Sequence, residues 1–342
     1  MMPARPALEP MPAITGLLEL FATHPLVAVG EVHGLQDEAD FITALLYHPG
    51  FPASVQVIVV EFGNARHQAV VDRFISGEPV AARDLRPVWR DFFGWGFDAP
   101  IYEQFFRTVR AINRTLPPAQ RLRVLLGDPP ADWSEIPPGA DIPSLMEQRD
   151  AHYTAVVETH VLAPGLHGLL IAGMGHFVRD WPAQLQSPPP ENIAQRLERT
   201  QPGSVHVIFP HIGFGAETSA LEPYLLDWPI PSLVSLRTTW LGELGAALHF
   251  GNFPPPPAGV EPPPLKQGLT LGALADSYLY LGPRSSLTRS TLNPAIYRGD
   301  ETLLNQLRRR LDVFPGGAPF TVEEIIVAAE QQAEGDPRFF PD

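Results

Sequence analysis

Five short apolar segments of this chain each end in, or are directly followed by, ionisable side chains. In chain order, those side chains are Glu31 with His33, Glu61, Asp128, His176 and His211. Carboxylates and imidazoles are the groups that acid–base catalysis requires, because like-charged neighbours separate carboxylate pKa values and histidine exchanges protons near neutral pH. The same set also offers oxygen and nitrogen ligands to a transition metal. The residue types therefore leave metal-free catalysis and metal binding open.

The five apolar segments have the composition of strands that are buried on both faces. They are rich in Val, Ile and Leu and span residues 26–30, 55–63, 122–128, 169–173 and 205–210. Segments with an apolar stripe of helical period lie between them, for example residues 36–48 and 101–116. This alternation predicts an α/β fold with a mainly parallel central sheet flanked by helices.

Parallel strands place their carboxyl ends along one edge of a sheet, where open α/β proteins bind ligands. Glu31 and His33 are two residues apart, so on an extended backbone both side chains point the same way. A helix expected to begin near Gln36 points its N-terminal amides toward the same place, which favours an anion.

We therefore expect one site at the strand ends, catalytic or, if a metal is bound, metal-ligating. Its expected members are Glu31, His33, Glu61 and His176, with Asp128 and His211 as additional candidates.

Each of these residues also has a structural interpretation. A single charged side chain after a strand is commonly a helix cap or a loop residue. Asp128 precedes two prolines and fits an ordinary turn, and His211 fits a site and a loop equally well. An aromatic group between the second and third strands suits either an apolar wall over the strand ends or the packing of helices, and we expect packing. Its members are Trp89, Phe92, Phe93, Trp95 and Phe97.

Proline clusters and composition divide the chain. We expect an α/β core over residues 1–252, with a helical insertion at about 64–120 that forms a small cap. A proline-rich linker over residues 253–268 should follow, because neither a helix nor a central strand continues through such a tract. Residues 269–342 are expected to form a C-terminal helical extension packed on the core.

The C-terminal extension contains three local signals. Residues 275–283 fit one more strand or a docking segment, and Asp300 is placed to begin a helix. Thr321 and Glu324 have the spacing of a capping box at the start of a last helix.

Composition excludes several classes of protein. The 342 residues are 44% apolar, enough for a sizeable core, and the formal net charge of −14 disfavours nucleic acid and anionic membranes as partners. The absence of cysteine excludes disulfides and thiol nucleophiles, and the only lysine, Lys266, does not follow a phosphate-binding glycine loop. With neither a long apolar run nor a secretory signal in the sequence, we expect a cytoplasmic protein that acts on small molecules, in an oligomeric state left open.

The order of the motifs resembles the ChaN-like family of haem-binding, iron-regulated proteins, within a wider superfamily that includes erythromycin esterases and Tiki proteases. The similar motifs, over roughly residues 20–215, are GEVHG, VVEFGNARHQAVVDRFISGE, LLGDPP, and LIAGMGHF followed by WPAQL. The resemblance implies an α/β core, a smaller helical part, and a site at Glu31, His33, Glu61 and His176. It implies metal-free hydrolysis with a histidine base in the esterase branch, metal-dependent hydrolysis in the Tiki branch, and haem binding in the ChaN branch.

Two functions follow as hypotheses. The leading one is a hydrolase of a small organic ester, lactone or amide, in which His33 or His176 activates water and Glu31 or Glu61 orients the imidazole. The alternative is a non-catalytic protein that binds haem or an iron compound through the same residues. A divalent transition metal or haem is accordingly the candidate cofactor. A purely structural role for the strand ends is a third interpretation.

Overall fold

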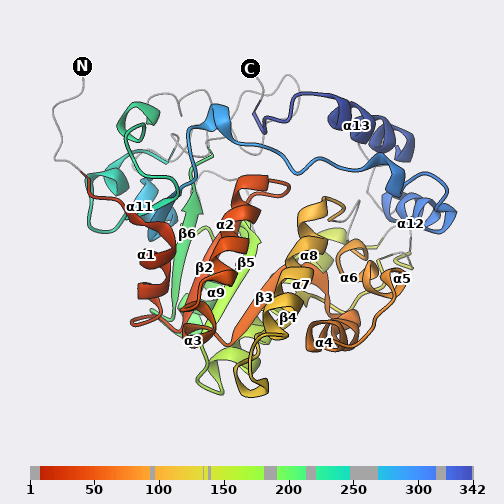
Figure 1. The fold of residues 1–342 in the computed structure, drawn as a ribbon, viewed down its shortest axis with the longest axis horizontal. Coiled ribbons are helices and arrows are strands. Elements are labelled where there is room, and N and C mark those ends of the chain that lie inside the picture. The colour runs from red at the N-terminus through yellow and green to blue at the C-terminus, as the bar shows by residue number, and fades with distance from the viewer. Residues whose placement is uncertain are drawn as a thin grey trace. The chain divides into compact units, whose positions relative to one another are not determined.

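The computed structural model describes residues 8–92, 97–133, 135–137, 140–180, 191–212, 221–246, 269–312 and 321–340 (Figure 1). Within these ranges, eight strands form one sheet in the order β1-β7-β8-β6-β2-β5-β3-β4. Their bounds are β1 (Met11–Pro12), β2 (Leu26–Glu31), β3 (Val57–Asn64), β4 (Arg123–Asp128), β5 (Gly168–Gly173), β6 (Val205–Pro210), β7 (Ser232–Ser235) and β8 (Ser277–Tyr280).

Parallel pairing dominates this sheet. β2 pairs with β6, β6 pairs with β8, and β3 pairs with both β4 and β5, all in parallel. β7 is antiparallel to β8, and β1 is antiparallel to β7. Every residue of β2, β3 and β5 is buried, as expected for strands covered on both faces. The α/β fold and the five strands predicted from the sequence are confirmed.

Helices connect and cover the strands (Figure 1). The described α-helices are α1 (Ala13–Leu20), α2 (Gln36–Tyr47), α3 (Phe51–Ser54), α4 (Gln68–Ser76), α5 (Ala82–Leu85), α6 (Pro87–Arg90), α7 (Pro100–Asn113), α8 (Ile142–Val157), α9 (Ile193–Thr200), α11 (Leu271–Leu274), α12 (Glu301–Asp312) and α13 (Val322–Glu334). The two helices predicted from periodicity are α2 and α7. The predicted insertion at about 64–120 is helical, since α4 to α7 all belong to it.

The chain forms two compact units, each made of two separate segments. Unit 1 comprises residues 1–32 and 172–287, and unit 2 comprises residues 33–171 and 288–342. In unit 1, α1 packs against β7 and α9 packs against β6. In unit 2, α4 packs against β4 and α7, while α8 packs against β4.

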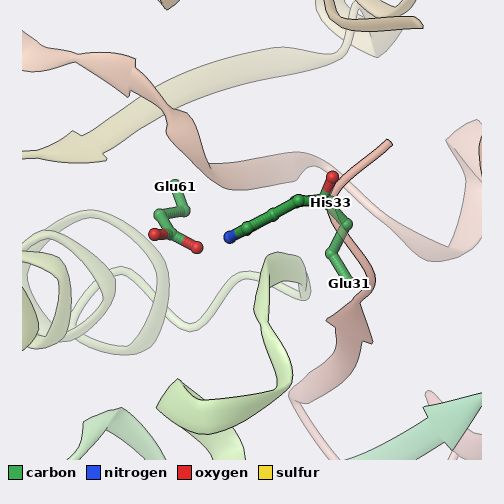
Figure 2. Close-up of side chains that lie close together, drawn as sticks. All are labelled: Glu31, His33 and Glu61. Atoms are coloured by element: carbon green, nitrogen blue, oxygen red, sulfur yellow. The ribbon is translucent and has the colours of Figure 1, made fainter. Parts of the chain in front are cut away.

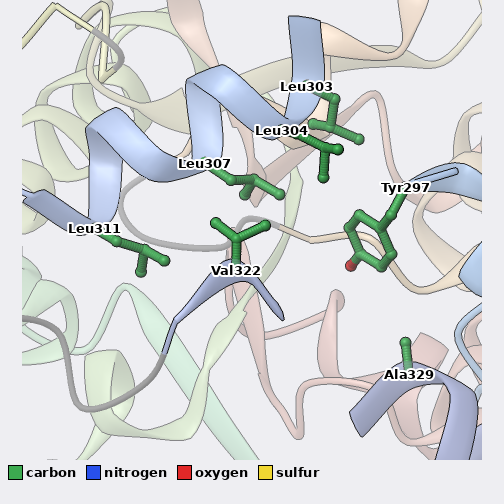
Figure 3. Packing of buried hydrophobic residues seen from close by; sticks show 7 residues of the cluster. All are labelled: Tyr297, Leu303, Leu304, Leu307, Leu311, Val322 and Ala329. Atoms are coloured by element: carbon green, nitrogen blue, oxygen red, sulfur yellow. The ribbon is translucent and has the colours of Figure 1, made fainter. Parts of the chain in front are cut away.

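The C-terminal segment, defined here as residues 288–340, belongs to unit 2. It begins beside α2, where the Gln36 amide donates to the Thr288 carbonyl at 3.0 Å and the Ser290 amide donates to the Gly34 carbonyl at 2.7 Å. Further along the segment, Leu303, Leu307 and Leu311 of α12 form a small core with Val322 of α13 (Figure 3). This core gives the two helices an apolar interface of their own.

The local signals near the C-terminus are confirmed. Residues 275–283 supply a strand, β8. The Leu303 amide donates to the Asp300 carboxylate at 3.0 Å, so Asp300 caps α12, and Thr321 with Glu324 forms the predicted capping box of α13. The two capping signals each involve residues three positions apart, which is why they are readable from sequence.

Some predictions fall on residues without a described structure. The linker over residues 253–268 lies outside the described residues, and so do Phe93 and Trp95 of the aromatic group. The division into a core over residues 1–252 and an extension over 269–342 stays a prediction. Within the described ranges, every helix is too short or too polar to cross a lipid bilayer.

Candidate functional site

Three of the predicted site residues meet near the carboxyl ends of β2 and β3. One ligand atom each from Glu31, His33 and Glu61 lies within 4.8 Å of the others, and Figure 2 shows the His33 ring directed toward the Glu61 carboxylate. Glu31 is the last residue of β2, and Glu61 lies near the end of β3. Both glutamates are buried, whereas His33 is exposed. The group therefore combines two sheltered carboxylates with an imidazole that solvent reaches.

His33 packs against an aromatic side chain of unit 2. The Phe97 ring meets the His33 ring edge-on, with centroids 5.1 Å apart and an interplanar angle of 82°. Phe97 is itself buried and packs against Phe62 of β3 and Tyr102 of α7. Edge-to-face packing favours a defined ring orientation, so Phe97 holds one side of the exposed imidazole.

A buried arginine links Glu61 to a second carboxylate. The Arg149 guanidinium of α8 donates from Nη2 to Glu61 Oε1 at 2.9 Å and from Nε to Asp128 Oδ1 at 2.5 Å. Asp128 also accepts a hydrogen bond from the Trp133 indole at 3.0 Å. The Phe92 ring lies 4.3 Å from the Arg149 guanidinium carbon in a cation–π contact. Charge, hydrogen bonds and stacking together fix the Glu61 carboxylate.

Packing of α8 on β4 sets the position of Arg149. A Cβ atom on Gly127 would lie 2.1 Å from the Tyr153 ring, so only glycine at this position of β4 lets α8 approach so closely. The Tyr153 hydroxyl donates to the Val59 carbonyl of β3 at 2.6 Å. Arg149 lies four residues before Tyr153, one helical turn away on the same face. The helix is thereby held where Arg149 reaches the ends of β3 and β4.

One guanidinium is shared between two carboxylates in this group. Burial raises the pKa of Asp128, and the charge of Arg149 opposes that rise. Burial also lowers the pKa of Arg149, but the negative charges of Asp128 and Glu61 outweigh that effect and raise it above its ordinary value. Arg149 therefore remains cationic at any working pH, and the group carries excess negative charge when both acids are ionised.

The start of α2 does not favour an anion as expected. The Gln36 amide already donates to the Thr288 carbonyl. The first turn also carries Asp37 and Glu38, and the Asp37 carboxylate accepts from the Thr288 amide at 2.6 Å. The Thr288 carbonyl thus occupies one amide of the first turn, and two acidic side chains already lie where an anion would bind. The expectation failed because residue 288 cannot be related to residue 36 from sequence.

The remaining predicted residues differ in their surroundings. Asp128 joins the site through Arg149 rather than serving only as a turn residue. His176 lies in a short 3₁₀ helix, η4 (Met174–Phe177), and is not among the described residues whose ligand atoms gather with Glu31. His211 is 0% exposed and lies 2.9 Å from the Tyr278 hydroxyl and 3.4 Å from the Glu222 carboxylate, which favours its structural interpretation. The functional roles of all six residues stay predictions.

The aromatic group serves both purposes considered from the sequence. Trp89 is buried and stacks on Phe106 of α7, as the packing interpretation predicts. Phe92 and Phe97 instead contact Arg149 and His33. The expectation of packing alone is therefore incomplete.

Sequence reasoning missed Arg149, which joins Glu61 to Asp128 in the site. It lies 88 positions from Glu61 and within an ordinary polar helix, so no spacing marks it. A requirement for a cation beside two buried carboxylates was the only available signal.

The fold has counterparts among solved structures. A protein from Bacillus cereus is 10% identical, with a TM-score of 0.55 over 84% of this chain and 97% of that one. A succinoglycan biosynthesis protein is 9% identical, with a TM-score of 0.55 over 80% of this chain and 94% of that one. An erythromycin esterase in its open conformation is 12% identical, with a TM-score of 0.48 over 78% and 92% of the two chains.

No family model and no curated protein sequence matches this chain. The likeness to the first two solved structures shows a shared mixed α/β fold.

Proposed function

We propose that this protein hydrolyses a small organic ester, lactone or amide, with His33 and Glu61 as its catalytic pair. The observation that carries the proposal is the arrangement of an exposed imidazole beside a buried carboxylate, with His33 and Glu61 ligand atoms within 4.8 Å (Figure 2). A general base must reach both water and substrate, whereas its carboxylate partner works best when held in place.

In the proposed reaction, His33 takes a proton from a water molecule as the water oxygen attacks the carbonyl carbon of the substrate. The imidazolium that forms is stabilised by the Glu61 carboxylate and then returns the proton to the leaving oxygen or nitrogen as the carbon–heteroatom bond breaks. Glu31 adds a second carboxylate near the same imidazole.

Arg149 is the positioning residue of this mechanism. Its hydrogen bond to Glu61 Oε1 fixes the carboxylate, and its ion pair with Asp128 fixes the guanidinium in turn. A carboxylate held from two elements loses little orientational freedom when the imidazolium forms, which is the advantage of preorganised charge.

The motif resemblance supports the same assignment. The first motif supplies Glu31 and His33, the second supplies Glu61, and the fourth supplies His176, at strand ends as the resemblance implies. We propose on this basis that the chain belongs to the superfamily of erythromycin esterases, ChaN-like proteins and Tiki proteases. His176 remains the alternative base.

Hydrolysis of p-nitrophenyl acetate by wild type, His33→Gln, Glu61→Gln and His176→Gln tests the proposal. We expect His33→Gln and Glu61→Gln each to lower kcat/KM by about 100-fold or more, the usual contribution of a general base. His160→Gln is the matched control, because His160 is exposed on another part of unit 2. Unchanged rates in both His33→Gln and Glu61→Gln would rule out this catalytic pair.

Binding of a metal ion or haem iron is the second candidate, favoured by the three ligand atoms within 4.8 Å. Two carboxylates and one imidazole fit a divalent transition metal, although Glu61 Oε1 already accepts from Arg149. Metal content by elemental mass spectrometry, and a visible absorption band on haem titration, are measured for wild type and His33→Ala. Stoichiometric metal or a haem band that is lost in His33→Ala supports this candidate, and their absence from wild type contradicts it.

A further inference from the structure

Four residues of unit 2 form what we call the aromatic loop: Asp91, Phe92, Phe97 and Asp98. Its two aromatic members contact the candidate site, since Phe92 stacks on Arg149 and Phe97 packs against His33. The two aspartates flank these rings in sequence. Whatever holds the aspartates therefore sets where the rings lie.

The C-terminal segment holds the first aspartate through a buried arginine. Arg310 of α12 is 2% exposed, its Nη1 donates to the Arg90 carbonyl, and its Nη2 lies 3.4 Å from Asp91 Oδ1. Asp91 also lies 3.1 Å from the His67 ring nitrogen. Burying a guanidinium is costly unless it is paired, which indicates that Arg310 is committed to this contact.

The same segment holds the second aspartate through a tyrosine. The Tyr297 hydroxyl donates to Asp98 Oδ2 at 3.1 Å, and Asp98 Oδ1 lies 3.1 Å from Arg90 Nε. Tyr297 is 2% exposed, and its ring belongs to the small apolar core shared with α12 and α13 (Figure 3). Because this packing holds the ring in place, it also fixes the position of the hydroxyl.

Both anchoring residues lie about 200 positions from the aspartates that they contact. The aromatic loop is therefore held by tertiary contacts and not only by neighbouring residues. Local bonds add to them, for example from the Phe97 amide to the Trp89 carbonyl at 3.1 Å. Each ring is thus next in sequence to an anchored aspartate, Phe92 to Asp91 and Phe97 to Asp98, which restricts its conformational freedom.

We propose that the C-terminal segment sets the geometry of the candidate site, with Arg310 and Tyr297 as positioning residues that hold Phe92 against Arg149 and Phe97 against His33. The catalytic part of this inference rests on the proposed hydrolase function, and the anchoring part stands without it.

The test uses the full chain as wild type, Tyr297→Phe, Arg310→Met and Arg309→Met. Tyr297→Phe removes one hydroxyl and keeps the ring in its apolar core, so it leaves the fold intact. Arg309→Met is the matched control, because Arg309 is the next residue of α12 and is 61% exposed in an ion pair with Glu135. Hydrogen exchange is followed at the Asp91, Phe92 and Phe97 amides, and the His33 ring resonances are followed by NMR.

We expect exchange at these amides to rise by about tenfold in Tyr297→Phe and further in Arg310→Met, since each loses a buried hydrogen-bonded contact. The His33 resonances should shift in both variants because the neighbouring Phe97 ring moves. Arg309→Met should match wild type. In ester hydrolysis, kcat should fall while KM changes little, and Arg310→Lys should restore part of the loss.

Unchanged exchange and unchanged His33 resonances in both variants would overturn the inference, whether or not the wild type hydrolyses esters. A uniform rise in exchange throughout unit 2 would also overturn it, because the role would then be general stability. Loop-specific changes with unaltered kcat in an active protein would refute the catalytic part. If the wild type hydrolyses nothing, the proposed function fails, and loop-specific changes would still support the anchoring.

Discussion

Two buried charge groups, one in each unit, have opposite ratios of acid to base. In unit 1, Asp276 accepts from Arg179 at 2.6 Å, from Arg237 at 2.5 Å and from the Val207 amide at 2.8 Å. In unit 2, one guanidinium, that of Arg149, is shared by Asp128 and Glu61. A carboxylate with two cations is a closed structural unit, whereas a cation with two carboxylates leaves negative charge beside the exposed His33.

The pKa directions follow the same contrast. Burial by itself would raise the pKa of Asp276, but the charge of Arg179 and the Val207 amide outweigh it and lower the pKa below 3.8. Burial dominates at Asp128 and raises its pKa, since Arg149 is shared. At Asp128, deeper burial and the sharing of Arg149 act in the same direction, so the difference teaches that burial and partner number together separate a charge group that stabilises the fold from one that is available for proton chemistry.

Removing the shared cation should have the largest effect. We expect Arg149→Met to lose about 3–5 kcal/mol of unfolding free energy at pH 7, because two buried carboxylates lose their counter-charge. The loss should shrink as the pH falls and Asp128, whose pKa burial raises, becomes protonated. Urea unfolding measured by circular dichroism at pH 7 and pH 4 checks both points.

Arg237→Met is the control for that measurement. Arg237 is 56% exposed and Arg179 remains beside Asp276, so its loss should cost at most about 1 kcal/mol. Equal losses for Arg149→Met and Arg237→Met would break the comparison between the two groups.

A matched pair of asparagine substitutions gives the next largest effect. We expect Asp276→Asn to cost about 3 kcal/mol at pH 7, because Arg179 and Arg237 both lose their contact with this buried carboxylate, while Arg179 keeps Glu198 and the Val205 carbonyl. Asp128→Asn should cost only about 1 kcal/mol, because Arg149 keeps Glu61. Chemical denaturation of both variants beside wild type measures the two costs.

The pH dependence of these two aspartates has opposite signs. The folded pKa of Asp276 is lowered, so its stabilisation is present above its ordinary value of 3.8 and disappears as the pH falls through the folded pKa. The folded pKa of Asp128 is raised, so its contribution is complete below 3.8 and is lost as the pH rises through the folded pKa. Parallel pH profiles for the two variants would contradict this assignment.

His206 of unit 1 extends the comparison to histidines. Burial lowers the pKa of His206 from 6.5 to about 4. Between these two pH values the unfolded chain binds a proton at this histidine and the folded chain does not. The free energy of unfolding therefore falls as the pH drops from 6.5 to about 4. His206→Gln should remove up to about 3 kcal/mol of that acid-induced loss. Thermal unfolding is measured from pH 7 to pH 4 for His206→Gln and, as a control, for His160→Gln, because His160 is exposed. An identical loss of stability with falling pH in the two variants would contradict the prediction.

The smallest expected effect concerns the indole that supports Asp128. Trp133→Phe removes the donor of a 3.0 Å hydrogen bond and keeps most of the apolar volume, so we expect a loss of about 1 kcal/mol. Urea unfolding measures it. A loss as large as that of Arg149→Met would mean that the indole, rather than the arginine, holds the group together.

Features set by neighbouring residues were predictable from sequence. Continuous apolar runs identified the strands that became β2 to β6, because strands covered on both faces need apolar side chains throughout. The helix starts at Asp300 and Thr321 were readable because a cap involves residues three positions apart. The proximity of Glu31, His33 and Glu61 followed from the rule that parallel strands deliver their ends to one edge.

Partners distant in the chain were not predictable. Arg149 lies 88 residues from Glu61, and Tyr297 lies 199 residues from Asp98. The expectation of an anion site at the start of α2 also depended on a distant partner, because the Thr288 carbonyl accepts the hydrogen bond of the Gln36 amide.

The sequence by itself determined the α/β class, the strands and which ionisable residues follow them, since these depend on local composition and alternation. Only the tertiary structure decided which of those groups share a charge: Asp128 joins Glu61 through Arg149, whereas His211 is enclosed with Tyr278. The physical reason is that a buried charge must find a partner wherever packing brings one, and packing relates residues irrespective of their separation in the chain.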